Sequence, residues 1–411
     1  MTDFKIQIPL IQHTPILHFQ GEYADEGATL RATELKPKLD RYITANHSGP
    51  IPIEWKIGKT NALNYKLRIT TFEEAVLKGG QPPMFFGEGK NLLQIPHMKD
   101  SRQIEIMLEL FCNIESLYEN LKSVDWKSFF LANNFGTRQS KGYGSFFVDS
   151  QKTGLTSMIG KTIINGDASY RVDSFFTIIG NANDWKGVMT QIGDVYKCMR
   201  GGINENGLYF KSLMFSYARY YKSERKKDSL YWDKRMIKEE FYPNNRKMQL
   251  KEHPGSDPLL DFKDNEINQE PFLFRDYLGL SSNESWAIPY HAKLSKKNNA
   301  IARFKSPILF KPLFINNQWI VFLLHREIPH GLINKTFKVH DKHSNKTIYM
   351  NTYPSFSMDE YINFVLCVKD YDRIFSIKKD TLENRTRKKN IVTNLNNLRT
   401  NFIQIEKSSN T

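Results

Sequence analysis

The sequence predicts an α+β fold that is spread over more than one domain. Runs typical of strands, such as residues 318–324, occur together with stretches whose apolar residues return every three or four positions, such as residues 184–200. The chain has 411 residues, of which 40% are hydrophobic and 13% aromatic, so it can bury a sizeable core. At about 150 residues per domain, this length corresponds to two or three domains.

The first third of the chain is expected to place helices between strands. We expect one or two strands within residues 5–19, the second at residues 16–19, and a short helix over residues 31–43, in whose first turn Pro37 is tolerated. The further predicted elements are strands at 51–55 and 64–71, a break at 79–83, an amphipathic helix from Ile104 to Tyr118, and a helical turn at 125–132.

The rest of the chain continues this mixture. The predicted elements are a strand at 145–148, a β-rich run at 170–180, a helix at 184–200 ending at Gly201-Gly202, a helix at 211–221, and two strands at 300–310 and 318–324 joined by residues 312–317. Residues 359–369 form a helix or a strand. The tail 378–411, rich in Lys, Arg and Asn, is either a terminal helix or a partly disordered arm.

A glycine-rich loop at residues 134–146 is the strongest functional signal. It combines three glycines, Gly136, Gly142 and Gly144, with the cations Arg138 and Lys141, directly ahead of a strand-like run. Glycine permits positive φ and lets backbone amides approach a phosphate or a sugar closely, while a ring such as that of Tyr143 offers stacking. A hairpin turn would also use glycine, so the composition of the loop leaves both interpretations open.

Charge is consistent with a polyanionic partner. The chain has 58 Lys and Arg against 44 Asp and Glu, a formal net charge of +14, and a pI of about 9.4. On the predicted helix at 31–43, Lys36, Lys38 and Arg41 form either a solvated face or a phosphate-binding face. In the charged segment 222–264, cations lie among aromatic residues, which suits single-stranded RNA and equally suits an insertion that packs by its rings.

Composition also bears on the cellular compartment. Cys112, Cys198 and Cys367 are widely spaced in apolar surroundings, which indicates free thiols in a reducing environment. We find no signal peptide and no apolar run of about 20 residues. The expected location is the cytoplasm.

No motif for catalysis, a metal or a cofactor stands out. His13, His18, His325 and His330 lie in or beside apolar runs, where a histidine is usually a packed, hydrogen-bonded residue. There is no His-x-x-x-His helix motif and no Cys-x-x-Cys pair, and the glycine-rich loop lacks the Gly-Lys-Ser/Thr ending of a nucleotide-binding loop. We therefore expect no catalytic residue, metal or cofactor.

The loop resembles a family motif. Gly136-x-Arg138-x-x-Lys141-Gly142-Tyr143-Gly144-Ser145 is similar to the glycine-rich loop of the RAMP superfamily of CRISPR-associated proteins. Residues 14–19 and 30–39 resemble that superfamily's first strand and its "SLKGALR" helix start, although Pro37 replaces the usual glycine and Asp40 displaces the closing arginine to Arg41. The order of these motifs is most similar to the first subunit of the Cmr module, type III-B. A short Arg-Phe-Lys-Ser-Pro element, Arg303 to Pro307, also resembles a RAMP strand start.

The resemblance implies both a fold and a function. The fold would be α+β with two ferredoxin-like (RRM-like) domains, a charged insertion and helical additions, divided into residues 1–150, 151–271 and 272–411. The function would be that of a non-catalytic RNA-binding subunit of a type III CRISPR ribonucleoprotein in antiviral defence, with guide RNA, target RNA and other effector subunits as partners and no membrane. The implied RNA-binding residues are Arg31, Lys36, Lys38, Arg41, Gly136, Arg138, Lys141, Gly142, Tyr143, Gly144, Ser145, Phe146, Arg303 and Lys305.

Three other functions remain as alternatives. RAMP backbone subunits carry a cutting aspartate after the first strand, and Glu22, Asp25 and Glu26 occupy a comparable place. A guide-RNA-processing endonuclease shares the fold and the loop, but there the loop commonly lies near the carboxyl terminus, whereas here it lies near residue 140. A purely structural interaction protein would have negligible RNA affinity.

Overall fold

The computed structural model describes residues 4–16, 30–71, 76–78, 95–97, 104–148, 154–218, 231–233, 237, 240–241, 271–280, 283–285, 293–301, 303–341 and 345–409. The chain divides into two compact units. The first unit comprises residues 1–192, 309–326 and 401–411, and the second comprises residues 193–308 and 327–400. Within the described ranges, every helix is too short or too polar to cross a bilayer.

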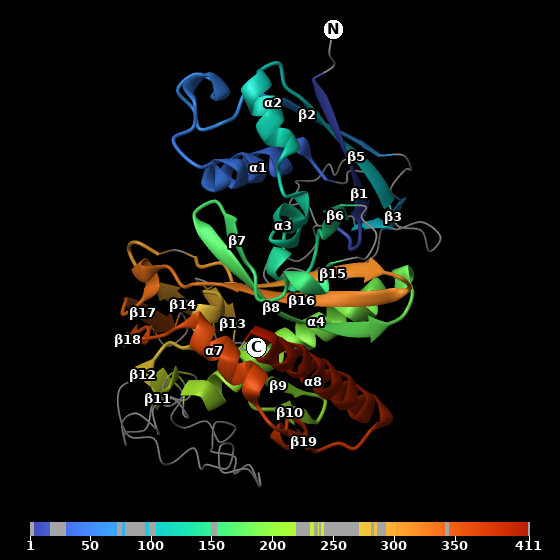
Figure 1. Cartoon of the computed structure of the whole chain (residues 1–411). Coiled ribbons are helices and arrows are strands. Elements are labelled where there is room, and N and C mark those ends of the chain that lie inside the picture. The colour runs from blue at the N-terminus through green and yellow to red at the C-terminus, as the bar shows by residue number, and fades with distance from the viewer. Residues whose placement is uncertain are drawn as a thin grey trace. The chain divides into compact units, whose positions relative to one another are not determined.

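The first unit begins with a four-stranded antiparallel sheet of order β2-β5-β1-β6 (Figure 1). Along the chain the elements run β-α-β-β-α-β, with a small β3-β4 hairpin between β2 and β5. This is the order that a ferredoxin-like unit requires. The assignment of both halves to that fold stays a prediction. The elements are β1 (Lys5–Gln12), α1 (Ala32–Asn46), β2 (Lys66–Thr71), β3 (Val76–Lys78), β4 (Ile95–His97), β5 (Ile104–Phe111), α2 (Glu115–Lys122), α3 (Trp126–Leu131) and β6 (Phe146–Val148), with single 3-10 turns η1 (Ile53–Trp55) and η2 (Gln139–Lys141).

The core of this sheet is formed by apolar side chains that occupy every second position along its strands. Leu10, Ile106, Leu108 and Leu110 are buried on one face, because successive side chains of a strand point to opposite sides. α1 packs on this core through Leu35, Leu39, Tyr42 and Ile43, and α3 through Phe129 and Phe130. The opposite face carries polar contacts, such as those of Glu109 with Lys5 and Gln7.

A second four-stranded sheet of the first unit, of order β15-β16-β8-β7, brings together distant parts of the sequence (Figure 1). Its strands are β7 (Thr162–Asn165), β8 (Ala168–Ile179), β15 (Ile308–Ile315) and β16 (Gln318–Arg326), and the turn η3 (Thr156–Met158) precedes β7. β15 and β16 are joined by a two-residue turn in which Asn316 and Asn317 have φ of 54° and 58°. Asparagine tolerates this left-handed conformation, which matches the twist of a hairpin.

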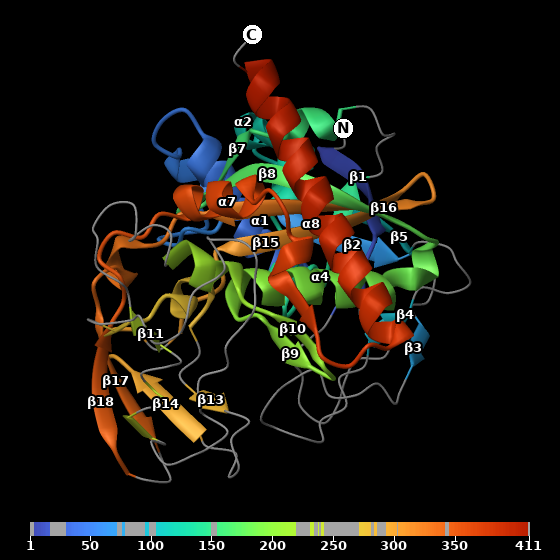
Figure 2. The same cartoon turned by 90° about the horizontal axis from the view of Figure 1, so that it is seen from below.

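The second unit contains two further sheets, of order β19-β10-β9 and β11-β12-β18-β17-β14-β13 (Figure 2). The long helix α8 begins in the second unit and ends in the first, which includes residues 401–411. α4 (Trp185–Arg200) runs from the first unit into the second, after the turn η4 (Ala182–Asp184). The other elements are β9 (Ile203–Glu205), β10 (Leu208–Phe210), β11 (Tyr231–Trp232), β12 (Pro271–Phe272), η6 (Arg275–Leu278), β13 (Asn283–Ser285), β14 (Lys293–Lys297), η7 (His330–Leu332), β17 (Thr336–Asp341), β18 (Thr347–Asn351), α7 (Met358–Cys367), η8 (Asp372–Ile374), β19 (Phe375–Ile377) and α8 (Leu382–Ser409).

The α+β prediction is confirmed, and so are the strands or helices predicted near 5–12, 31–43, 64–71, 125–132, 145–148, 170–180, 184–200 and 318–324. The helix at 184–200 ends as expected, since Gly202 has a φ of 79° and its amide donates to Lys197. Residues 213–218 are helical, within the predicted range. Residues 359–369 lie largely in helix α7, and the tail forms helix α8.

Three predictions are wrong. The amphipathic helix from Ile104 to Tyr118 is instead strand β5 followed by helix α2. The strand at 51–55 is the 3-10 turn η1. The strand predicted at 300–310 is instead β15, Ile308–Ile315, so the connection to the next strand consists of the two asparagines alone. Most of the strand at 16–19, the break at 79–83 and most of segment 222–264 lie outside the described residues.

Candidate nucleic-acid interface

The glycine-rich loop, residues 134–146, connects α3 to β6 in the first unit. Four of its residues have positive φ: Gly136 (72°), Arg138 (53°), Gly142 (86°) and Gly144 (67°). Residues 136–141, which we call the rim, are half-buried, whereas residues 142–147, which we call the support, are buried. The loop therefore has an accessible rim on a packed support.

Gly142 and Gly144 serve the packing of the loop against the protein itself. A Cβ at Gly142 would lie 2.9 Å from the ring of Pro312 on β15, and one at Gly144 would lie 2.0 Å from the carbonyl oxygen of Phe135. We expected these glycines to let RNA approach the backbone. In the structure, the space that a side chain would need is occupied by residues of the same unit, so internal packing is sufficient to require glycine at both positions.

Hydrogen bonds join the support to the residues that follow β1. The Thr14 hydroxyl donates to the Gly142 carbonyl at 2.6 Å and accepts from the Ser145 amide at 2.9 Å. The Gly144 amide donates to the Pro15 carbonyl at 2.8 Å. The Ser145 hydroxyl donates to the Pro312 carbonyl at 2.8 Å. Ser145 thus acts inside the support and has no exposed surface.

The two aromatic residues that we expected to stack on bases are also in the support. Phe146 is completely buried and packs edge-on against Phe135, with ring centroids 5.9 Å apart. Tyr143 is only 7% exposed, and burial raises the pKa of its hydroxyl. A base cannot stack on Phe146 without displacing β6, so we do not include it among the proposed contacts.

The cations of α1 divide into different roles. Lys36 pairs with the buried Asp40 at 2.8 Å and donates to the Leu63 carbonyl, so it holds α1 in place. Lys38 donates to the Asn134 carbonyl at 2.5 Å and to the side chain of Gln139 at 3.1 Å, which ties α1 to the loop. Both ammonium groups are engaged with the protein, which weakens their expected role as phosphate contacts.

Of the remaining cations of α1 and the loop, one is exposed and three are half-buried like Lys36 and Lys38. Arg41 is exposed, and Arg31, at the N-cap of α1, is half-buried. On the rim, Arg138 and Lys141 are half-buried, and desolvation lowers the pKa of Arg138 although the nearby Tyr143 partly offsets this effect. The rim is braced by the Gly136 amide, which donates to Glu34 at 3.2 Å.

Arg303 and Lys305 are exposed residues of the second unit. The first unit therefore brings together the cations of α1 and of the loop, whereas these two belong to a separate unit.

Sequence reasoning missed the residues that support the loop. Lys311 on β15 is completely buried, and its ammonium contacts both ends of the loop. Asn134 donates its amide hydrogens to the carbonyls of Gln139, at 2.7 Å, and Phe310, at 2.9 Å. A lysine within the otherwise apolar strand 308–315 was the available signal, because an uncompensated lysine is rare inside a core.

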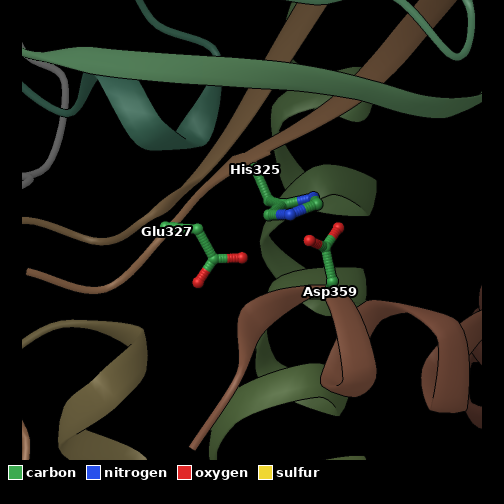
Figure 3. Close-up of side chains that lie close together, drawn as sticks. All are labelled: His325, Glu327 and Asp359. Atoms are coloured by element: carbon green, nitrogen blue, oxygen red, sulfur yellow. The ribbon is translucent and has the colours of Figure 1, made fainter.

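The described histidines that we considered for chemistry have different surroundings. His325 lies at the end of β16 (Figure 3). Its Nδ1 is 2.8 Å from Asp173, and both residues are buried. His13 accepts a hydrogen bond at Nδ1 from the Phe314 amide, and burial, followed by the charge of Lys311, lowers its pKa to about 3. His330 is exposed on η7.

Two described carboxylates of the second unit lie close together. Glu327 and Asp359, also drawn in Figure 3, are carboxylates of the second unit whose oxygen atoms lie within 4.8 Å of each other. Such acidic pairs are common at protein surfaces. The acidic residues Glu22, Asp25 and Glu26, and also His18, lie outside the described residues.

Comparisons with known families cover nearly the whole chain. The family model of the Cmr1 N-terminal domain matches residues 3–203, and that of the Cmr1 C-terminal domain matches residues 209–394. Searches of curated proteins and of solved structures returned no match.

Proposed function

Because this chain belongs to the Cmr1 family, and is thus a subunit of a type III-B CRISPR effector that assembles with other effector subunits, we propose that it binds guide RNA, target RNA or both through the rim. We further propose that it holds RNA in the cytoplasm without cutting it. The two fully buried histidines, His13 and His325, fit this role, since each is engaged with its own unit.

The observation that carries the proposal is the contrast between rim and support. The support is closed by internal hydrogen bonds and by the packing of Gly142 and Gly144, whereas the rim stays accessible and carries two cations three residues apart. Arg138 occupies a left-handed conformation that glycine adopts more easily, so this backbone position is maintained by the loop around it. A pre-ordered loop loses little conformational entropy when it binds a phosphate chain.

Contacts of this kind would recognise the backbone of RNA. Guanidinium and ammonium groups pair with phosphate oxygens and position the strand without reading the bases. Binding should therefore tolerate changes of sequence and weaken as salt rises. The basic net charge of +14 favours the same class of partner.

Fluorescence anisotropy with a labelled single-stranded RNA tests the proposal. For single strands, log K changes with log salt by about 0.7 per phosphate contact, so the R138A/K141A protein should show a salt slope smaller by about 1.4. At about 0.1 M salt the same relation corresponds to a loss of affinity of about 25-fold.

The matched control is K59A/K122A, which removes two exposed cations elsewhere in the first unit. If both double variants lose affinity equally, the attraction is a general effect of charge and the rim is not the contact. RNA cleavage that requires Asp25, measured with the same labelled strand, would favour the endoribonuclease alternative.

A further inference from the structure

Lys311 is an unusual residue for the interior of a sheet. It lies on β15 with no exposed surface, and its ammonium donates to the Asn133 carbonyl at 2.9 Å, the Phe146 carbonyl at 2.8 Å and the Asn134 side-chain oxygen at 3.2 Å. Among the described residues, no carboxylate forms an ion pair with it. Burial, and then the positive charge of Lys38, lower the pKa of Lys311 well below its usual range.

Such a group is costly to bury, and its surroundings show how the cost is offset. An ammonium has three N–H donors, and here three oxygen atoms accept them. Burying an unpaired charge is unfavourable, but an apolar side chain at this position would leave the three oxygens without a donor. Packing alone therefore does not explain why a lysine is buried at this position.

The three acceptors identify what the ammonium does. Asn133 and Asn134 lie at the point where the chain enters the loop, and Phe146 lies where it leaves. A single side chain, 165 or more residues away in sequence, thus joins both ends of the loop. Lys38 adds a second tie from α1, because it donates to the Asn134 carbonyl and to Gln139 within the rim.

We propose that Lys311 is a positioning residue, whose ammonium closes the base of the loop and thereby holds Arg138 and Lys141 in the geometry that binds RNA. This inference rests on the proposed function of the rim. Lys311 itself does not contact RNA, because it has no exposed surface. Its effect on affinity passes entirely through the two rim cations.

A double-mutant cycle tests this dependence. K311M leaves the three oxygens without their donor, and RNA affinity should fall about 10-fold in the otherwise unchanged protein. In the R138A/K141A background the same substitution should change affinity less than about twofold, because the residues that it positions are already absent. An equal loss in both backgrounds would overturn the proposal.

Hydrogen–deuterium exchange provides the second measurement, and it does not involve RNA. Exchange of the amides of residues 136–141 should be faster in K311M, while that of β1 and β5 stays unchanged. The control is L313A, which removes a buried apolar side chain from the same strand and destabilises the unit, although a leucine side chain has no hydrogen-bond donor to offer the loop ends. K311Q, which keeps two N–H donors, replaces K311M if that protein does not fold.

The two measurements separate the two hypotheses. Faster exchange in the rim, together with an RNA affinity that R138A/K141A does not change, would refute the RNA role of the rim while leaving Lys311 as the residue that orders the loop. Unchanged exchange in the rim of K311M would refute the positioning role, whatever the rim binds.

Discussion

Replacing Gly144 by alanine should destabilise the first unit far more than an ordinary glycine replacement in a turn. An alanine Cβ would lie 2.0 Å from the carbonyl oxygen of Phe135, whereas real Cβ atoms essentially never approach such an atom within 3.0 Å. Because the obstacle is backbone, a change of side-chain rotamer cannot relieve the overlap. The hydrogen bond from the Phe135 amide to the Gly144 carbonyl, 2.9 Å long, would be distorted as well.

The loss of folding stability expected for G144A is the sum of three contributions. Alanine at a φ of 67° costs about 1–2 kcal/mol, the overlap about 1–3 kcal/mol, and the hydrogen bond about 1 kcal/mol. Together these contributions amount to about 3–6 kcal/mol. G58A is the matched control, because Gly58 has a φ of 57° but no atom within 4 Å of the point where an alanine Cβ would lie, so only the first contribution of about 1–2 kcal/mol applies.

Differential scanning calorimetry measures the difference in unfolding temperature between G144A and G58A. The transition of the first unit is identified as the one that L39A lowers, since Leu39 is completely buried in its core. At about 2–4 °C per kcal/mol, the midpoint of G144A should lie about 5–15 °C below that of G58A. Equal midpoints for the two variants would refute the claim that Gly144 is required by close packing of the loop.

Two further predictions concern buried ionisable groups. His13 is neutral in the folded unit, with a pKa of about 3, but binds a proton in the unfolded chain below pH 6.5, so stability should be lost as pH falls from about 6.5 towards 3, by up to about 1.4 kcal/mol per pH unit. Urea unfolding of H13N between pH 7 and 4 should show a shallower decline, and an identical decline would contradict the assignment. In the second unit, Lys296 pairs with Asp276 at 2.8 Å and neither side chain is exposed. K296M should cost about 3–5 kcal/mol in chemical denaturation, and D276N/K296M should cost less than the single variant; a larger cost for the double variant would argue against a buried pair.

Local sequence signals predicted most elements because those elements depend on neighbouring residues. The helix at 185–200 has an apolar face and a glycine C-cap, and both are properties of the segment itself. For the residues from Ile104 to Phe111, the same reasoning predicted a helix where the structure has a strand. Their apolar side chains fit steps of three and four, yet Ile106, Leu108 and Leu110 also alternate in the manner of a strand. Pairing with β1 and β2 on either side selected the strand.

At the candidate site, too, local sequence patterns predicted the backbone conformation but not the contacts with distant segments. Its glycines predicted a tight turn with positive φ, and this is what the structure contains. The sequence did not reveal what approaches those glycines. Pro312 and Lys311 come from β15, more than 160 residues further along the chain, so no local pattern could indicate that the loop is packed against them.

The amino-acid sequence alone determined the α+β character, the family resemblance and the position of the loop, because strand and helix periodicity, glycine content and motif order are written in adjacent residues. The tertiary structure decided which of the loop's residues are accessible. Burial is a property of residues brought together from distant segments, and it places Gly142, Gly144 and Phe146 in the support while leaving Arg138 and Lys141 on the rim.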